Sequence, residues 1–115
     1  MVSRARPQCW DVWFGDLDPT VGNEQAGDRP LIVVSSDFHL RMFPTLVTVL
    51  PLTGRERPGL LHRVPVTSLD KAGYVITEQI RTISRSRLRR PVATLTVGEV
   101  RQVKEVLARM IDLRP

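Results

Sequence analysis

Apolar and polar residues alternate at every second position over much of the chain, which is the pattern of strands with one buried face. Alternation over residues 10–14 predicts a first strand that ends near Leu17. A polar loop over residues 21–29 follows, with two glycines. Pro30 then marks the start of a second strand over residues 31–34, whose unbroken apolar run predicts burial on both faces.

The middle of the chain continues in the same way. Further strands are predicted over residues 45–50, 61–66, 74–76 and 79–83. The strand over residues 61–66 contains Pro65, which lacks an amide N–H and therefore favours the edge of a sheet. Residues 38–44 predict an irregular crossover with room for one helical turn.

The C-terminal segment follows a different period. Thr96 and Glu99 have the spacing of a capping box, in which each side chain binds a free amide at the start of a helix. Apolar residues then recur at three- and four-residue steps up to about Ile111, namely Val97, Val100, Val103, Leu107 and Met110. We therefore expect a mainly β fold, a small antiparallel barrel or twisted sheet closed by a C-terminal helix, formed as a single domain over residues 1–115.

Charge and composition narrow the class of protein. The 115-residue chain has a net charge of +5, and Lys71 and Lys104 are the only lysines among its 17 basic residues. Arginine forms planar, two-pronged hydrogen bonds to phosphate and carboxylate, so this bias favours anion recognition. Cys9, the single cysteine, cannot form an intramolecular disulfide, and two histidines with one cysteine are too few for an ordinary structural zinc site. With no apolar run of about 20 residues, we expect a cytoplasmic protein.

The loop over residues 16–30 is the most informative segment. It places Asn23, Glu24, Gln25 and Arg29 around two glycines, directly before an apolar strand. Taken alone, this composition fits either an ordinary solvated loop or a polar site at the mouth of a barrel.

The pattern G-x-E-Q-x-G-x-R-P in this loop closely resembles the signature of the MazF/PemK toxin family. The runs D-V-W-F-G-D-L-D-P-T before it and L-P-L-T and E-Q-I-R-T-I after it are similar to the family's other motifs, in the same order. The resemblance implies an SH3-like barrel and a bacterial homodimeric endoribonuclease. Such a toxin cleaves single-stranded RNA without a metal ion or other cofactor and is silenced by a MazE-like antitoxin with an acidic C-terminal tail. Trp10 stands where the family often has glycine, and the loop over residues 53–61 is where relatives vary most.

Residue by residue, the resemblance implies that Arg29 and Thr53 are catalytic and that Glu24 contributes to activity. Attack of a 2′-hydroxyl on the adjacent phosphate makes phosphorus five-coordinate and concentrates negative charge on its oxygens. A guanidinium and a hydroxyl that converge on these oxygens stabilise that charge. Arginine stays protonated in proteins, so we expect Arg29 to act as an electrostatic clamp, while Glu24 or a water takes the proton.

The remaining polar residues predict how RNA is held. Asn23, Gln25 and Gln79 are candidates for hydrogen bonds to unstacked bases. Arg81, Arg55 and Arg57 are candidates for phosphate contacts, which strengthen binding without reading sequence. The basic run over residues 81–90 fits equally well with a solvated face.

Several alternatives stay open at this level. His39 and His62 lie in different predicted segments and are expected to be hydrogen-bonded or solvent-facing rather than an acid–base pair, and Cys9 is expected to be inert. The fold also fits a CcdB-like toxin that binds DNA gyrase without cutting RNA, or a non-toxic nucleic-acid-binding barrel. Messenger RNA is the expected target, with transfer or ribosomal RNA as alternatives.

Overall fold

The computed structural model describes residues 6–18, 22, 24–60 and 62–113. Its elements in chain order are β1 (Asp11–Asp16), β2 (Asp28–Val33), α1 (Asp37–Met42), β3 (Leu46–Thr53), β4 (Val64–Val66), β5 (Gly73–Val75), the 3-10 turn η1 (Thr77–Gln79), β6 (Arg81–Ser84), the 3-10 turn η2 (Arg85–Arg87), β7 (Leu88–Thr94) and α2 (Val97–Met110). The predicted class, mainly β with a C-terminal helix, is confirmed. Neither helix in this described part has the length and apolar character needed to cross a membrane.

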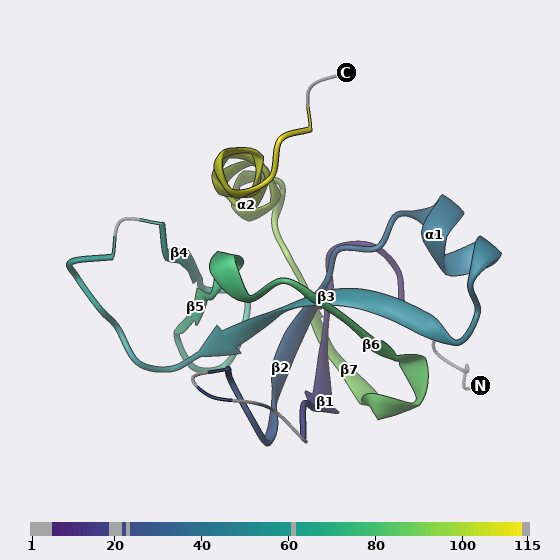
Figure 1. The fold of residues 1–115 in the computed structure, drawn as a ribbon. Helices are drawn as coiled ribbons and strands as arrows, with labels where there is room; N and C mark the ends of the chain where they lie inside the picture. Colours follow the sequence, from purple (N-terminus) through teal and green to yellow (C-terminus); the bar gives the residue numbers. More distant parts are fainter. Residues whose placement is uncertain (1–5, 19–21, 23, 61, 114–115) are drawn as a thin grey trace.

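The strands form an antiparallel sheet that curls into a half-barrel (Figure 1). The order of the strands is β4-β5-β3-β2-β1-β7, and β6 pairs with the first half of β3 beside β5. The short strand β4 lies at the edge, as Pro65 predicts, although it begins at Val64 rather than at residue 61. In Figure 1, α2 lies over the end of the sheet that carries β4 and β5, and α1 lies at the opposite end.

Alternation along the strands divides the buried residues into two clusters. Val12, Ile32 and Leu50 face α2 and pack with its Val103 and Leu107. Their neighbours in sequence point the other way, into a second cluster with these members: Trp13, Leu17, Leu31, Val33, Leu40, Val47, Val49 and Ile83. The apolar run of β2 is therefore buried on both faces, as predicted.

Two further predicted boundaries are wrong, and one strand was missed. Strand β2 begins at Asp28, because it pairs with β1 from that residue onward and the fixed φ of Pro30 suits an extended strand. Its ladder with β3 begins only at Leu31. Strand β3 continues past residue 50 to Thr53. Strand β7 was not predicted at all, because its charged residues and Pro91 hide the alternation, as is common in an edge strand.

The helix α2 begins as predicted. The hydroxyl of Thr96 accepts a hydrogen bond from the amide of Glu99, and the carboxylate of Glu99 accepts one from the amide of Thr96. The predicted apolar face is shorter than expected, because Val97 is 77% exposed and Met110 is 42% exposed.

Glu99 also ties α2 to the turn after β4. One carboxylate oxygen accepts a hydrogen bond from the amide of Thr67 at 2.7 Å, and the other accepts one from the hydroxyl of Ser68. Burial by itself raises the pKa of Glu99, but the hydrogen bonds from Ser68, Thr96 and Thr67 outweigh it and hold the pKa at about 2.

Trp10 has the backbone conformation of a glycine. Its φ is 74°, in the left-handed region that is unfavourable for residues other than glycine. This agrees with the glycine that the MazF/PemK family often has at this position. Its amide donates to the carbonyl oxygen of Val33 at 2.7 Å, and its own carbonyl oxygen accepts from the amide of Leu95. The ring packs against the cluster under α2, with the ammonium of Lys104 5.8 Å from its centre.

Candidate functional site

The loop between β1 and β2 is shaped by glycines and by contacts to distant segments. Gly27 has a φ of 76° and donates its amide to the carboxylate of Asp18 at 2.9 Å. The amide of Gln25 donates to the side-chain oxygen of Gln79 at 2.7 Å, which joins this loop to η1. Gln25 and Gln79, both predicted from the sequence as candidates for binding RNA bases, are therefore in direct contact.

Arg29 is held at the start of β2 by backbone carbonyls. Its Nε and Nη2 donate to the carbonyl oxygen of Ala26 at 3.2 Å and 3.0 Å. Its Nη1 donates to the carbonyl oxygen of Leu52 on β3 at 3.1 Å. Burial lowers the pKa of Arg29, yet an arginine remains a cation in proteins. The guanidinium is thus a fixed positive charge against the strand that carries Thr53.

Thr53 ends β3 on the same face as Arg29. Leu31 and Pro51 lie opposite each other in the β2–β3 ladder, and Arg29 and Thr53 are each two residues from this pair, so alternation sets both on the same face. The hydroxyl of Thr53 accepts a hydrogen bond from the amide of Arg55 at 3.2 Å, so its proton remains available for donation.

Arg81 is the third predicted residue on this face. It lies opposite Val49 on the other side of β3, and Val49 and Thr53 are four positions apart, so they share a face of the strand. The Nη1 atom of Arg81 is buried and has no hydrogen-bond partner among the described residues. A buried guanidinium nitrogen without an acceptor is uncommon, because losing water without a replacement costs free energy.

Three other predicted residues lie in the loops before β2 and after β3. Glu24 is exposed in the loop before β2, and Arg55 and Arg57 are exposed in the loop after β3. Asn23 lies outside the described residues.

The arginines of the basic run over residues 81–90 make contacts with other parts of the protein, although Arg89 and Arg90 remain exposed. Past Arg81, its arginines are bound to the protein itself. Their contacts are Arg85 with the carbonyl oxygens of Leu40, Phe43 and Leu46, Arg87 with those of Asp16 and Asp18, Arg89 with the carboxylates of Asp16 and Asp28, and Arg90 with the ring of Phe14. These side chains hold η2 and β7 against the rest of the fold.

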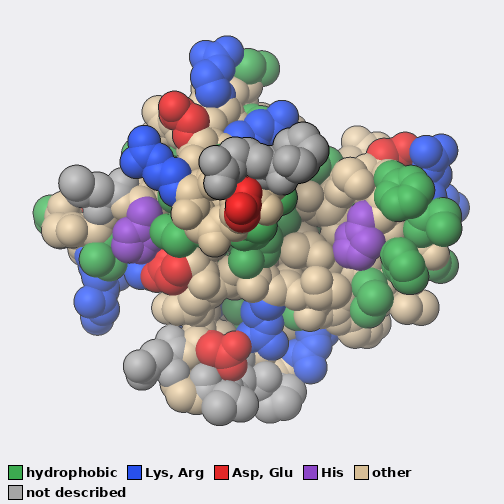
Figure 2. Space-filling view, turned by 45° about the horizontal axis from the view of Figure 1, so that its top comes forward, with side chains coloured by type: hydrophobic (Ala, Val, Ile, Leu, Met, Phe, Trp, Pro, Cys, Tyr) green, Lys and Arg blue, Asp and Glu red, His purple; other side chains and the backbone are tan. Residues whose placement is uncertain are grey.

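The two histidines serve separate networks and are far apart on the face shown in Figure 2. His39 bonds through Nδ1 to the hydroxyl of Ser35 at 2.7 Å. His62 pairs through Nε2 with Glu78 at 3.1 Å, and Arg63 pairs with the other oxygen of Glu78 at 3.2 Å. No sequence pattern predicts this three-residue cluster, because Glu78 lies at least 15 residues from His62 and Arg63. No group of three His, Cys, Asp or Glu side chains that could hold a metal ion is present in the described part of the chain.

Burial raises the pKa of the Cys9 thiol, which outweighs the opposing effect of the Lys104 charge. A raised pKa lowers the fraction of reactive thiolate at neutral pH. This agrees with the expectation that Cys9 is inert.

The fold and this face define a class: a half-barrel of antiparallel strands closed by a C-terminal helix, with arginine, hydroxyl and amide side chains gathered at the ends of β2 and β3. Residues 8–111 match the model of the family described as PemK-like, MazF-like toxin of type II toxin-antitoxin system. The chain belongs to this family.

Individual relatives agree. The chain is 30% identical over 102 residues to endoribonuclease MazF of Staphylococcus saprophyticus, covering 84% of both proteins. Its fold is similar to the crystal structure of MazF from Deinococcus radiodurans, with a TM-score of 0.84, 23% identity and coverage of 96% of this chain and 100% of that one. It is also similar to an endoribonuclease in complex with its cognate antitoxin from Mycobacterial species, with a TM-score of 0.77, 22% identity and coverage of 96% and 99%.

Proposed function

We propose that this chain is the endoribonuclease toxin of a type II toxin–antitoxin system and cleaves single-stranded RNA at specific sequences without a metal ion. The observation that carries the proposal is the position of Arg29, whose guanidinium is bonded to Leu52 beside Thr53. Membership of the MazF-like family supports it, as does the activity named for the staphylococcal relative. A gyrase-binding toxin of the CcdB type is not favoured, because a pure binder has no need of this pair.

The reaction is an internal transfer of the phosphoryl group. The 2′-oxygen forms a bond to phosphorus and loses its proton, while the bond from phosphorus to the 5′-oxygen breaks and the 5′-oxygen takes up a proton from water. The products are a 2′,3′-cyclic phosphate and a 5′-hydroxyl. Arg29 and the hydroxyl of Thr53 stabilise the negative charge on the phosphoryl oxygens of the transition state. Glu24 or a water takes the proton of the 2′-hydroxyl.

Neighbouring residues hold the substrate. Arg81 lies on the face of Arg29 and Thr53, opposite Val49, and its guanidinium is proposed to contact a phosphate there. Arg55 and Arg57 contact phosphates from the exposed loop after β3. Gln25 and Gln79, together with Asn23, hydrogen-bond to unstacked bases. The substrate is messenger RNA, or alternatively transfer or ribosomal RNA, in the bacterial cytoplasm.

Two protein partners complete the proposal. A MazE-like antitoxin with an acidic C-terminal tail suits a chain of net charge +5, and the mycobacterial structural relative was determined with its cognate antitoxin. The protein acts as a homodimer. Exposed apolar side chains on and after α1 support this assembly, notably Phe38, Met42 and Phe43, and Figure 2 shows hydrophobic side chains gathered beside one histidine.

The test is cleavage of a long single-stranded RNA in the presence of EDTA. Arg29→Ala and Thr53→Ala are each expected to lower the rate by about 100-fold, the usual loss of one preorganised donor. Arg101→Ala is the matched control, because Arg101 is an exposed arginine on α2, outside the strands and loops of the site. Full cleavage by both site variants contradicts the assignment of the site, and no cleavage of any RNA by the unchanged protein contradicts the proposed function.

A further inference from the structure

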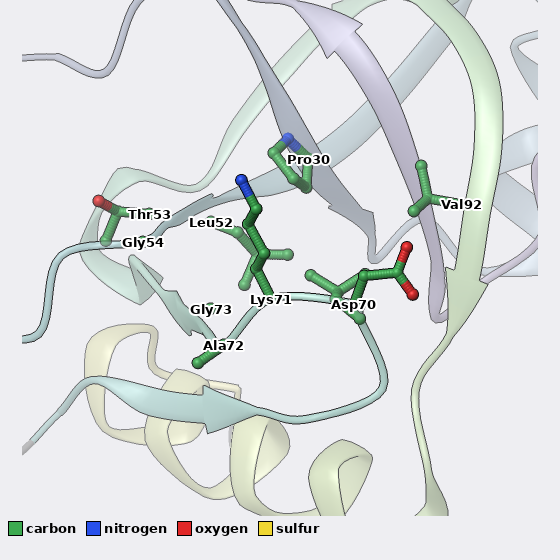
Figure 3. A pocket seen from close by; sticks show the side chains of 10 residues that line it. Pro30, Leu52, Thr53, Gly54, Asp70, Lys71, Ala72, Gly73 and Val92 are labelled. Atoms are coloured by element: carbon green, nitrogen blue, oxygen red, sulfur yellow. The ribbon is translucent and has the colours of Figure 1, made fainter.

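A cavity of about 290 Å³ opens next to Thr53. Pro30 on β2 and Leu52 on β3 form one wall, Val92 on β7 lies across from them, and the turn before β5 closes the remaining side (Figure 3). The cavity lies where the curled sheet brings β7 near the turn between β4 and β5. It is therefore a product of the tertiary structure, and it adjoins both Thr53 and the residue after Arg29.

Most of the lining is apolar, and its two charged residues are neighbours in the turn. Figure 3 shows the ammonium of Lys71 reaching toward Pro30, on the side of the cavity where Thr53 lies. The carboxylate of Asp70 points the other way, toward Val92. The cavity thus has a positive charge on the side of Pro30 and Thr53 and a negative charge on the side of Val92.

The reaction proposed for Arg29 and Thr53 needs such a space. In-line attack requires the 2′-oxygen, phosphorus and 5′-oxygen to lie nearly in a row, and stacking of consecutive bases holds RNA away from this geometry. A base that leaves the stack exposes its apolar faces, which proteins cover with apolar or aromatic surfaces. An apolar cavity bordered by Thr53 meets this need.

We propose that this cavity binds the unstacked base of the nucleotide next to the cleaved bond, that Lys71 binds a phosphate of that nucleotide, and that Asp70 selects the base. The inference rests on the proposed endoribonuclease function. A carboxylate only accepts hydrogen bonds, and guanine offers it two donors side by side, N1–H and the N2 amino group. Uracil offers one donor flanked by two carbonyl oxygens that the carboxylate repels. Asp70 therefore favours guanine over uracil at one position beside the cleaved bond.

The experiment compares cleavage of an RNA pool randomised at the positions flanking the cleaved bond. Asp70→Asn is expected to lower the preference for guanine over uracil at one position by about tenfold. Lys71→Met is expected to raise KM severalfold and to reduce the salt dependence of binding by about one phosphate contact. Asp37→Asn and Lys104→Met are matched controls, because Asp37 lies on α1 and Lys104 on α2, and neither lines the cavity.

A second measurement separates this inference from the proposed function. Binding of short single-stranded RNAs with a 2′-O-methyl group at the cleaved position does not depend on cleavage. The unchanged protein is expected to bind the guanine-containing RNA more tightly than its uracil counterpart, and Asp70→Asn is expected to remove the difference. If the protein binds both RNAs equally, the base-selecting cavity is wrong even when cleavage occurs.

If RNA is bound as predicted but never cut, only the proposed function fails. Lys71→Met could instead weaken the binding of an acidic peptide while the base preference and KM of RNA cleavage stay unchanged. Such a result would show that the cavity binds a protein. That result overturns the inference. Thermal melting of all four variants checks that each is folded.

Discussion

The Nη1 atom of Arg29 donates a hydrogen bond to the carbonyl oxygen of Leu52 at 3.1 Å, so the arginine at the start of β2 is fastened to the strand that ends in Thr53. The same guanidinium donates to Ala26 from its other nitrogens. The position of the positive charge thus depends on the planar shape of arginine as well as on its charge.

Replacing Arg29 by lysine tests this dependence. Lysine keeps the charge but has a single nitrogen, which cannot reach the carbonyl oxygens of Ala26 and Leu52 with arginine's geometry. We expect Arg29→Lys to lower kcat for RNA cleavage by about 100-fold while KM changes little. Cleavage rates over a range of RNA concentrations give kcat and KM, and thermal melting checks that the variant is folded. A lysine variant with wild-type kcat would show that charge alone is sufficient.

The hydrogen bonds to Glu99 predict a loss of stability in acid. The pKa of Glu99 is about 2 in the folded protein, against roughly 4.3 in an unfolded chain. Because the folded value is the lower one, the carboxylate contributes its full stabilisation above about pH 5, and this contribution is lost as the pH falls toward 2. Denaturant unfolding between pH 7 and pH 2.5 measures it.

Glu99→Gln is expected to lower the free energy of unfolding at pH 7 by about 2 kcal/mol, because its amide group faces donors and cannot accept from all of them. The variant should also lose part of the acid dependence. Glu105→Gln is the control, since Glu105 is exposed on the same helix. Equal pH profiles for the two variants would contradict the role given to Glu99.

The left-handed backbone of Trp10 predicts an unusual ranking of two substitutions. Trp10→Ala and Trp10→Gly both remove the ring and its packing, but only alanine keeps the cost of a positive φ. The glycine variant is therefore expected to be more stable than the alanine variant by about 1 kcal/mol. Denaturant unfolding of the pair decides it, and a more stable alanine variant would be inconsistent with the φ of 74°.

Gly15 on β1 is required for a different reason, the close approach of its neighbours. A Cβ atom at this position would lie 2.8 Å from the carbonyl oxygen of Arg87 and 3.0 Å from a methyl group of Leu31. Gly15→Ala is expected to lower the free energy of unfolding by about 2 kcal/mol, as overpacking does elsewhere.

Gly98→Ala is the matched control for this effect. Nothing lies within 4 Å of a Cβ at Gly98, which is on the exposed side of α2. This substitution should raise stability by about 0.5 kcal/mol, because alanine favours helices. A neutral Gly15→Ala variant would mean that β7 moves away without cost.

Local patterns predicted those features that depend on neighbours in sequence. The capping box of Thr96 and Glu99, the edge position of the strand with Pro65 and the two-sided burial of β2 all follow from spacing or from the chemistry of one residue. The motif around Arg29 identified the family in the same way. Such signals survive in a sequence because the interacting groups are only a few residues apart.

Features that depend on long-range contacts were not predictable. Arginines that seemed free for RNA, such as Arg85 and Arg89, are bound to carbonyl oxygens and carboxylates of other elements. Glu99 was expected only to cap its helix, yet it also binds Ser68. Lys71 and Asp70 carry no motif, and only the curl of the sheet brings them to the cavity beside Thr53.

The order of residues along this chain was sufficient to predict a β fold with a C-terminal helix and, through the motif around Arg29, the family to which the chain belongs. Alternation and capping act over a few residues, and a motif is a property of the chain itself. The tertiary structure decided which arginines bind other parts of the protein, which carbonyl oxygens hold the guanidinium of Arg29 and which side chains line the cavity. These depend on strand register and sheet curvature, which set the distances between residues that lie far apart in the sequence.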